Sequence, residues 1–360
     1  MEDNINKSHK GFKIFVLLLL IGVLFFINKD NQGKLIKAYK SLTIRQKSLE
    51  KIESISLDSG INEVGLFDKN IALWGNNKLS IVDINNDLVL EKQFNFENPD
   101  IVFGQKSSYI MDKSIGDIYI INSKGETVER VGLDNSINNL IEHEDNVIIH
   151  TESEEKENLV LLDTNGVFFR IHPIENIDIL TYTFDKKNEK YLISNLNIED
   201  ELRSEIQIYS INGELLDKVQ IPNEIIIFTE FVNEDLIALT DRCLYYIKDG
   251  KVFWKKTFSD IKDILLNNNE IYILYGENLE ILDIEGRIIS KLSFNKKYSR
   301  MKNFDKYLLI YGDNNLIWIQ GSKEILDYKH STDIKDIVIN RNYLAIMDDS
   351  NLHLFKVINK

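Results

Sequence analysis

Residues 279–286 read Leu-Glu-Ile-Leu-Asp-Ile-Glu-Gly, an apolar strand that runs into a tight turn built from Asp, Glu and Gly. Glycine suits such a turn because a tight hairpin needs positive φ, which glycine adopts at low cost and Asn or Asp adopt less readily. A second, more polar strand follows at 288–294, and two short apolar stretches precede the unit at 261–266 and 271–275. This stretch therefore predicts four short antiparallel strands joined by tight turns.

The same unit recurs along the chain at a period of about 35 to 47 residues, a spacing that indicates a repeat architecture. The apolar strand and its Asp, Asn or Gly turn appear at 79–87, 118–125, 159–166, 208–213, 244–250, 279–286 and 316–321. A further apolar strand, 352–355, ends the chain without a following partner. Repeated units of four short strands are typical of propeller blades.

The two ends of the repeat region are predicted to meet. Residues 51–57 have the length and onward spacing of a fourth strand that has no blade of its own. Pairing them with 352–355 would complete an eighth blade and remove an exposed sheet edge. The sequence therefore predicts an all-β fold, an eight-bladed β-propeller over residues 51–360. Seven blades are the alternative if one repeat is degenerate.

An apolar segment lies close to the N-terminus. Residues 14–27 are uncharged and almost wholly apolar, and Phe12 extends the run across Lys13. Such a helix spans roughly 21 to 24 Å, short for a hydrocarbon core of about 30 Å, but flanking lysines can reach the membrane surface. No small-residue cleavage site follows the segment. We expect a short basic tail at 1–11 and a transmembrane signal-anchor helix at 12–28.

Charge is distributed unevenly along the chain. The net formal charge is −14, yet residues 1–51 carry ten Lys and Arg against four Asp and Glu. The strongly acidic remainder argues against nucleic-acid binding, which depends on Lys and Arg contacts to phosphates. Leu35, Tyr39, Leu42 and Leu49 fall at helical spacing and predict a basic juxtamembrane helix or linker at 29–50, either a solvated stalk or a contact with anionic lipid or wall polymer.

The side of the membrane follows from two opposing patterns. The basic residues after the span would, by the positive-inside rule alone, hold the propeller in the cytoplasm. A short basic head before an apolar core is typical of export signals, and long domains translocate largely regardless of charge. We expect a single-pass cell-membrane protein with an extracytoplasmic propeller.

The sequence contains no motif that indicates catalysis. It has no phosphate-binding glycine loop, serine nucleophile elbow or paired Cys-x-x-Cys. The turn that begins at Asp83 starts like a calcium loop but lacks the required Gly and Glu. Cys243 is the only cysteine, so a disulfide within the chain is impossible, and the six histidines show no ligand spacing on one strand. We therefore predict no catalytic residue, cofactor or metal, and a protein that is not an enzyme.

Two acidic stretches stand out among the expected turns between second and third strands. They lie at 151–158 in blade 3 and 197–205 in blade 4, adjacent blades that present such turns on one rim. Long loops on a rigid scaffold often carry binding residues, although charge runs are also typical of a merely solvated surface. The candidate partner-binding residues are Glu152, Glu154, Glu155, Glu157, Glu199, Asp200, Glu201 and Glu205.

The repeats resemble those of known propeller families. Residues 248–255, Lys-Asp-Gly-Lys-Val-Phe-Trp-Lys, are similar to quinoprotein-like (PQQ-like) repeats, in which an Asp and Gly turn precedes a Trp-bearing strand. The whole plan, one N-terminal span and such a propeller, resembles a family of bacterial membrane-anchored propeller proteins of unassigned activity, with WD40-like repeats. This resemblance implies fold and topology. Only Trp254 is in register, and the Gly-His and Trp-Asp pairs of WD40 repeats do not occur.

These patterns favour a membrane-tethered, non-enzymatic propeller that binds a protein or a surface polymer. One alternative is a ligand sensor or quinone-type enzyme that uses the central channel. Another is a structural envelope scaffold that acts through the span and the juxtamembrane segment.

Overall fold

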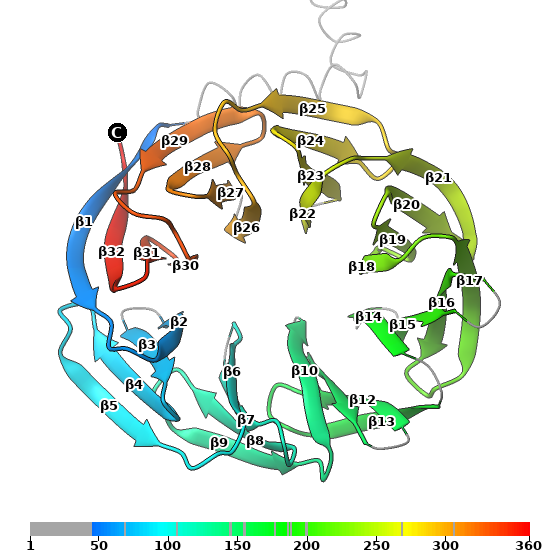
Figure 1. Cartoon of the computed structure of the whole chain (residues 1–360), viewed down its shortest axis with the longest axis horizontal. Helices are drawn as coiled ribbons and strands as arrows, with labels where there is room; N and C mark the ends of the chain where they lie inside the picture. The colour runs from blue at the N-terminus through cyan, green and yellow to red at the C-terminus, as the bar shows by residue number, and fades with distance from the viewer. Residues whose placement is uncertain are drawn as a thin grey trace, which may run out of the picture.

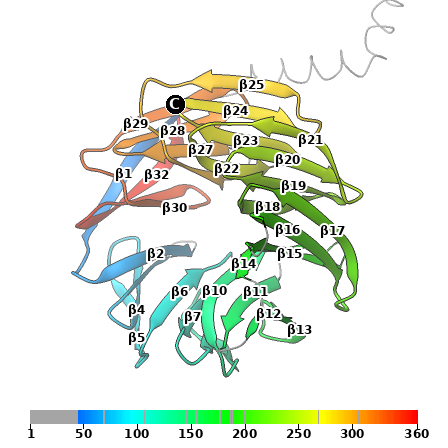
Figure 2. The same ribbon diagram turned by 45° about the vertical axis from the view of Figure 1, so that its right-hand side comes forward.

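The computed structural model describes residues 45–360 apart from 68–69, 106, 144–145, 154–155, 176–177, 186, 188, 199–200, 268 and 305–306, and the predicted segments 1–11 and 12–28 lie outside it. The described residues form eight four-stranded antiparallel sheets arranged in a ring (Figure 1). Blade 1 consists of β2 Ile61–Phe67, β3 Asn70–Gly75, β4 Lys78–Asp83 and β5 Leu88–Gln93, and blade 2 of β6 Pro99–Phe103, β7 Ser107–Asp112, β8 Asp117–Asn122 and β9 Thr127–Gly132. Blade 3 consists of β10 Ser136–His143, β11 Asn146–Glu152, β12 Lys156–Asp163 and β13 Phe168–Glu175, and blade 4 of β14 Asp178–Asp185, β15 Lys190–Asn197, β16 Arg203–Ser210 and β17 Leu215–Pro222. Blade 5 consists of β18 Ile226–Val232, β19 Asp235–Thr240, β20 Cys243–Lys248 and β21 Lys251–Thr257, and blade 6 of β22 Ile261–Asn267, β23 Glu270–Tyr275, β24 Asn278–Asp283 and β25 Ile288–Ser293. Blade 7 consists of β26 Arg300–Phe304, β27 Tyr307–Gly312, β28 Asn315–Gln320 and β29 Lys323–Lys329, and blade 8 of β30 Asp336–Asn340, β31 Tyr343–Met347, β32 Asn351–Asn359 and β1 Lys47–Ser56. In each blade the first strand lies nearest the centre of the ring and the fourth lies at its circumference (Figure 1, Figure 2).

The ring closes by joining the two ends of the described chain, as predicted. β1 pairs with β32 in antiparallel register, with Lys51 opposite Phe355 and Ile55 opposite Leu352. The eight-bladed prediction is therefore confirmed, and the seven-bladed alternative is wrong. β1 begins at Lys47, earlier than the expected start at residue 51, so Leu49 lies in this strand although its spacing suggested a helix.

The repeated Asp and Gly turn has a defined geometry. At the turn after β24, the side chain of Asp283 accepts a hydrogen bond from the Arg287 backbone N at 2.8 Å, and Gly286 has φ of +80°. A Cβ on Gly286 would lie 3.0 Å from the ring of Trp254 on the outer strand of the preceding blade. Glycine is thus needed both for the backbone conformation and for the close approach of neighbouring blades.

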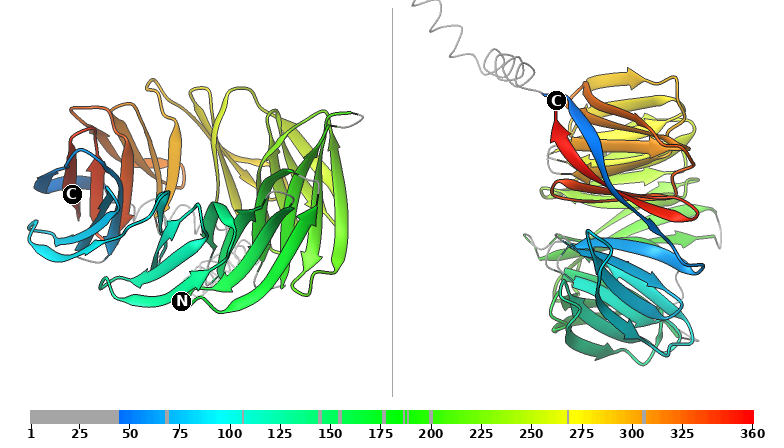
Figure 3. Two further views of the ribbon diagram at one scale, coloured as in Figure 1. Left: turned by 60° about the horizontal axis from the view of Figure 1, so that its bottom comes forward. Right: turned by 90° about the vertical axis from the view of Figure 1, so that its left-hand side faces the viewer.

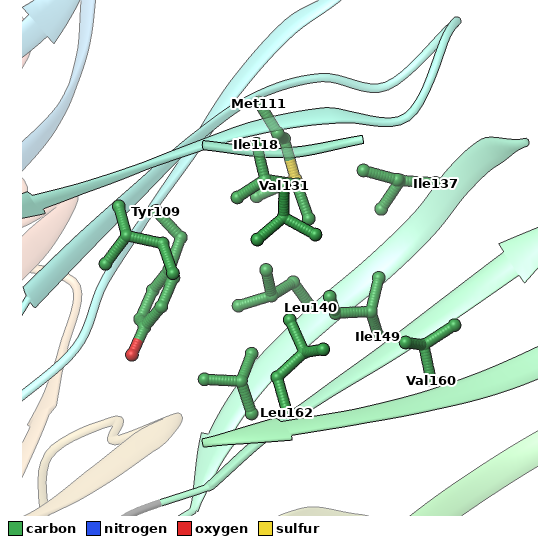
Figure 4. Close-up of a cluster of buried hydrophobic side chains, with 11 residues drawn as sticks. Tyr109, Met111, Ile118, Val131, Ile137, Leu140, Ile149, Val160 and Leu162 are labelled. Carbon is green, nitrogen blue, oxygen red and sulfur yellow. The ribbon is translucent and has the colours of Figure 1, made fainter. Parts of the chain in front are cut away.

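The hydrophobic core is divided among the interfaces between blades. Eight clusters of buried side chains occur in the described residues, one between each pair of neighbouring blades. Figure 4 shows the cluster between blades 2 and 3, where Met111 and Val131 face Leu140. Each blade is therefore stabilised chiefly by its two neighbours, which makes closure of the ring important for every blade.

The ring has two distinct faces. The turns between first and second and between third and fourth strands lie on one side, here called the turn face. The turns between second and third strands and the connections between blades lie on the other side, here called the connection face. β1 begins opposite Asn359, at the end of β32, so the chain enters the propeller at the turn face (Figure 3).

Candidate functional site

The predicted acidic loop of blade 3 is mostly strand. β11 extends to Glu152 and β12 begins at Lys156, and the Ser153 N donates to the Lys156 carbonyl at 2.8 Å to form a tight turn. Glu152 is exposed at the end of β11, where it accepts a hydrogen bond from Asn138 at 2.9 Å. Glu154 and Glu155 lie outside the described residues. The two strands therefore extend further into the predicted loop than expected.

Glu157 points into the molecule and not toward solvent. It lies in β12 on the same face as Leu159, which packs between blades 3 and 4. Its carboxylate lies 2.8 Å from His150 Nε2 and accepts a hydrogen bond from the Ile179 N of blade 4 at 3.2 Å. Glu157 thus supports the interface between two blades, a structural role that the charge pattern did not reveal.

The acidic stretch of blade 4 is divided in a similar way. The turn between β15 and β16 covers residues 198–202, in which Glu201 is exposed and Glu199 and Asp200 lie outside the described residues. Glu205 lies in β16 and is buried. Lys218 Nζ lies 2.6 Å from its carboxylate, and Gln207 and Gln220 donate hydrogen bonds to it at 2.6 and 3.0 Å. Of the predicted binding residues that the structure describes, Glu152 and Glu201 remain available on the surface.

Replacing Glu205 with alanine is expected to cost about 1–3 kcal/mol of stability, because the hydrogen bonds that Lys218, Gln207 and Gln220 make to its buried carboxylate are lost. Burial alone raises the pKa of Glu205, but the hydrogen bonds from Lys218, Gln220 and Gln207 outweigh it and lower this pKa below its ordinary value. A lowered carboxylate pKa stabilises the fold at neutral pH, and that contribution is lost as the pH falls through the acid range. Urea unfolding at several pH values should therefore show wild type and variant converging in acid, and a constant difference would contradict this role.

Exposed apolar side chains lie next to Glu201 on the connection face. They belong to the β15–β16 turn, the β17–β18 connection and the second residue of β18, and are here called the connection patch: Ile198, Leu202, Ile225 and Ile227, which are 69%, 37%, 36% and 51% exposed. The Asn223 N donates to the Leu202 carbonyl at 2.8 Å, which places the connection against the turn. Exposed clusters of large apolar residues mark interaction sites more often than scattered ones do.

The segment that carries the connection patch is held rigidly. Tyr245 OH donates to the Glu224 carboxylate at 2.8 Å, and Ser204 Oγ donates to the Glu224 carbonyl at 2.9 Å. The Ile225 N and the Asp241 side chain are also 3.0 Å apart. Ile225 therefore stands between blades 4 and 5 on a fixed backbone. Such preorganisation lowers the entropic cost of binding a partner.

The inner strands of blades 3, 4 and 5 each carry a β-bulge near the connection face. The register shifts between β10 and β11, β14 and β15, and β18 and β19, with one bulged residue on each inner strand: Asn138, Leu180 and Ile227. β-bulges redirect side chains and concentrate near functional sites. Ile227 and Leu180 line a cavity of about 300 Å³ at the channel. The connection patch thus continues from the outer loops to the mouth of the channel.

A second, larger cavity of about 760 Å³ opens toward the channel from blades 1, 6, 7 and 8. Hydrogen bonds and an ion pair link its charged groups across the interfaces between neighbouring blades. Lys302 Nζ donates to Asp336 Oδ1 at 2.7 Å, and Tyr311 OH donates to the same oxygen at 2.8 Å. The Met301 N donates to Asp263 at 2.6 Å. Asp336 and Asp263 therefore connect neighbouring blades.

A separate set of exposed apolar residues follows the turn face. The fourth strands of blades 1 to 6 each have such residues at or near their start, here called the apolar belt: Leu88, Val89, Val128, Phe168, Phe169, Leu215, Leu216, Val252, Phe253, Ile288 and Ile289. A basic residue follows in each strand: Lys92, Arg130, Arg170, Lys218, Lys255 and Lys291. The belt is interrupted at blades 7 and 8, whose fourth strands begin with Lys323-Glu324 and Lys47-Ser48.

The structure brings together two histidines and an aspartate whose proximity the spacing of the histidines in the sequence did not predict. His330 and His353 lie against Asp348 where blade 7 joins blade 8, and their ring centroids are 4.7 Å apart. This is the single group among the described residues whose ligand-type atoms are close enough to hold a metal ion. His330 follows β29 and His353 lies in β32, so their proximity depends on the order of the blades and not on sequence spacing. The remaining described histidines lie elsewhere, such as His172, which contacts Tyr191 OH at 2.7 Å.

These features define the class of the protein: a closed eight-bladed β-propeller with a cross-braced channel and an apolar patch on one face. The chain belongs to the family of unknown function DUF5711, whose family model matches residues 37–355. The search of curated protein sequences gives no significant match.

The chain is also similar to several solved propellers. Similarity extends over 86% of this chain, at 12% identity, to BamB from Moraxella catarrhalis (TM-score 0.57, 100% of that chain), to Saccharomyces cerevisiae Sqt1 (TM-score 0.62, 100% of that chain) and to the C-terminal WD40 domain of Sif2 (TM-score 0.63, 98% of that chain). At this identity the similarity shows the fold. It confirms the predicted resemblance to quinoprotein-like and WD40-like propellers.

The predicted membrane segment lies outside the described residues. Within the part of the chain that the structure describes, we find no helix with the length and hydrophobicity that a membrane crossing requires.

Proposed function

We propose that this protein is a membrane-tethered, non-enzymatic propeller that binds a protein partner through its connection face. The single observation that carries the proposal is the placement of two features on opposite sides of the ring. The chain enters β1 at the turn face, whereas the connection patch lies on the other side. A tether at 12–28 would therefore leave the connection face directed away from the membrane.

The apolar belt supports this orientation. Apolar side chains followed by basic residues suit a lipid surface, where apolar groups enter the interface and Lys or Arg contacts anionic headgroups. The belt is interrupted at blade 8, where β1 begins, and the basic segment 29–46 connects β1 to the predicted span. We propose that the turn face rests against the bilayer and that the propeller lies on the extracytoplasmic side.

A partner-binding function is favoured over a channel function because charged groups in the channel pair with each other, whereas apolar side chains on the connection face are exposed. In the channel, Lys302 and Asp336 satisfy each other across a blade interface. On the connection face, the apolar side chains of Ile198 and Ile227 are more than half exposed. A ligand sensor or quinone-type enzyme would need free polar groups in the channel, and bound quinone would show as absorption in the purified protein.

Cysteine labelling in intact cells tests the orientation. The native Cys243 is buried, so an introduced thiol reports on its own position. We expect Ile198→Cys to react with a membrane-impermeant maleimide-polyethylene glycol on intact cells, and Phe253→Cys, in the apolar belt, to react at least tenfold more slowly. Gel shifts of the full-length protein would measure both rates.

The same two variants in detergent provide the control. Both side chains are well exposed in the propeller, at 69% and 66%, so both should react at similar rates once the bilayer is removed. Equal rates in intact cells would overturn the lipid contact at the turn face. Labelling of Ile198→Cys only after lysis would overturn the extracytoplasmic location.

A further inference from the structure

Three side chains of metal-ligand type meet at the junction of blades 7 and 8. His330 follows β29, Asp348 lies in the turn between β31 and β32, and His353 lies in β32. His330 and Asp348 are 4% and 5% exposed. The group shares no residue with the connection patch or the apolar belt.

The geometry leaves one buried nitrogen without a hydrogen bond. His353 Nε2 lies 3.1 Å from Asp348 Oδ2, whereas His330 Nε2 lies 3.8 Å from the same oxygen, too far for a hydrogen bond. His330 Nε2 has no hydrogen-bond partner among the described residues. A buried polar atom without a partner is costly, so its orientation toward Asp348 calls for an explanation.

Asp348 and His353 are held in place by further hydrogen bonds, including contacts to their outer atoms Oδ1 and Nδ1. Asp348 Oδ1 accepts hydrogen bonds from the Ser350 N and the Asn351 N at 2.8 and 2.7 Å. Thr332 Oγ1 donates to Asp348 Oδ2 at 2.8 Å. His353 Nδ1 lies 2.8 Å from Ser54 Oγ on β1. Metal-binding histidines and carboxylates are commonly oriented by such outer contacts.

We propose that His330 Nε2, His353 Nε2 and Asp348 Oδ2 bind one divalent transition-metal ion, of which Zn²⁺ best suits this set of ligands. Two imidazoles and a carboxylate are typical zinc ligands, with bonds of about 2.0–2.2 Å. Tetrahedral bonds of that length place ligand atoms about 3.3 Å apart. The observed separations of 3.1 and 3.8 Å lie on either side of this value, and all three ligand atoms lie within 4.8 Å of one another. Water would occupy the fourth position.

The position of the site gives the ion a structural task. It would link the connection that leaves blade 7 to the central hairpin of blade 8. Through the contact of His353 with Ser54, it would also reach β1, the strand that closes the ring. Because the three ligands converge only in the folded ring, metal binding stabilises ring closure.

Metal binding is measured on the purified full-length protein in detergent, stripped with 1,10-phenanthroline and EDTA. We expect one Zn²⁺ per chain by elemental analysis after dialysis, and a rise in melting temperature of about 2–6 °C with saturating Zn²⁺. Co²⁺ in place of Zn²⁺ should give the visible absorption of a four-coordinate site. Failure to retain a stoichiometric ion, or a Co²⁺ spectrum of an octahedral aquo ion, would overturn the proposal.

Variants separate this site from adventitious binding. Asp348→Asn keeps an acceptor for the Ser350 and Asn351 N–H groups, so it should fold yet lose stoichiometric Zn²⁺. Ser54→Ala should weaken Zn²⁺ binding about 10–100-fold through the orientation of His353. His172→Gln, a change at a histidine outside the group, should bind as wild type does. Equal affinity in Asp348→Asn and wild type would refute the assignment.

Discussion

Replacing Ile55 with aspartate is expected to prevent ring closure and to destabilise the propeller by more than about 4 kcal/mol. Ile55 is 3% exposed in β1 and packs with Val64, Leu73 and Leu352 in the cluster between blades 8 and 1. An unpaired carboxylate in that cluster either stays charged in an apolar site or forces β1 away from β32. The first outcome is itself costly, and the second leaves the edge of β32 without its partner, an open edge that promotes aggregation.

The measurement is chemical unfolding of the full-length protein together with size-exclusion chromatography. Ser56→Asp is the matched control, because Ser56 is the next residue of the same strand and is exposed. It should unfold at the wild-type midpoint and elute as wild type does. Ile55→Ala should give an intermediate loss of about 2–5 kcal/mol. An Ile55→Asp variant with a wild-type midpoint would show that β1 contributes little to closure.

The fold could be predicted because its determinants are local and repeated. The turn from Asp283 to Gly286 is determined by its own residues, because the Asp283 carboxylate accepts a backbone hydrogen bond within the turn and Gly286 adopts positive φ. Closure was also predictable, because a strand without a partner at each end of a repeat region implies that the two strands pair. The pairing of Ile55 with Leu352 fulfils that requirement.

The site was harder to predict because it depends on contacts between blades. A charge run suggests a loop, yet the alternation of side chains in β12 places Glu157 on the same face as Leu159, where His150 satisfies it. Glu205 is satisfied by Lys218 from the neighbouring strand. Nothing local distinguishes these two carboxylates from Glu152 and Glu201, which stay on the surface.

The connection patch and the histidine group were missed for a related reason. Ile198 and Ile227 look like ordinary strand residues in sequence, and their exposure follows from a turn and a bulge. His330 meets His353 only after the chain has crossed from one blade to the next. One signal was present: His353 stands close after the Asp348 turn, a spacing that places both at one end of a strand pair.

Replacing Leu202 and Ile227 with aspartate is expected to weaken partner binding by about 30-fold or more without changing the melting temperature. Apolar side chains at the centre of an interface each contribute about 2 kcal/mol or more when they act as hot spots, and a buried charge adds a desolvation cost. Stability should not change, because the two side chains are 37% and 51% exposed. A photo-crosslinking amino acid at Ile198 identifies the partner in intact cells, and titration of that partner onto the purified protein measures affinity.

Ile115→Asp is the matched control for this test. Ile115 lies on the same face, in the turn between β7 and β8 of blade 2, and is 56% exposed, so it adds one negative charge away from the connection patch, against two in the double variant. If Ile115→Asp weakens binding as much as the double variant does, then the wider connection face and not the patch recognises the partner. If neither change affects affinity, the partner binds elsewhere. Loss confined to Leu202 and Ile227 would instead place recognition where blades 4 and 5 meet, on the backbone that Glu224 holds in position.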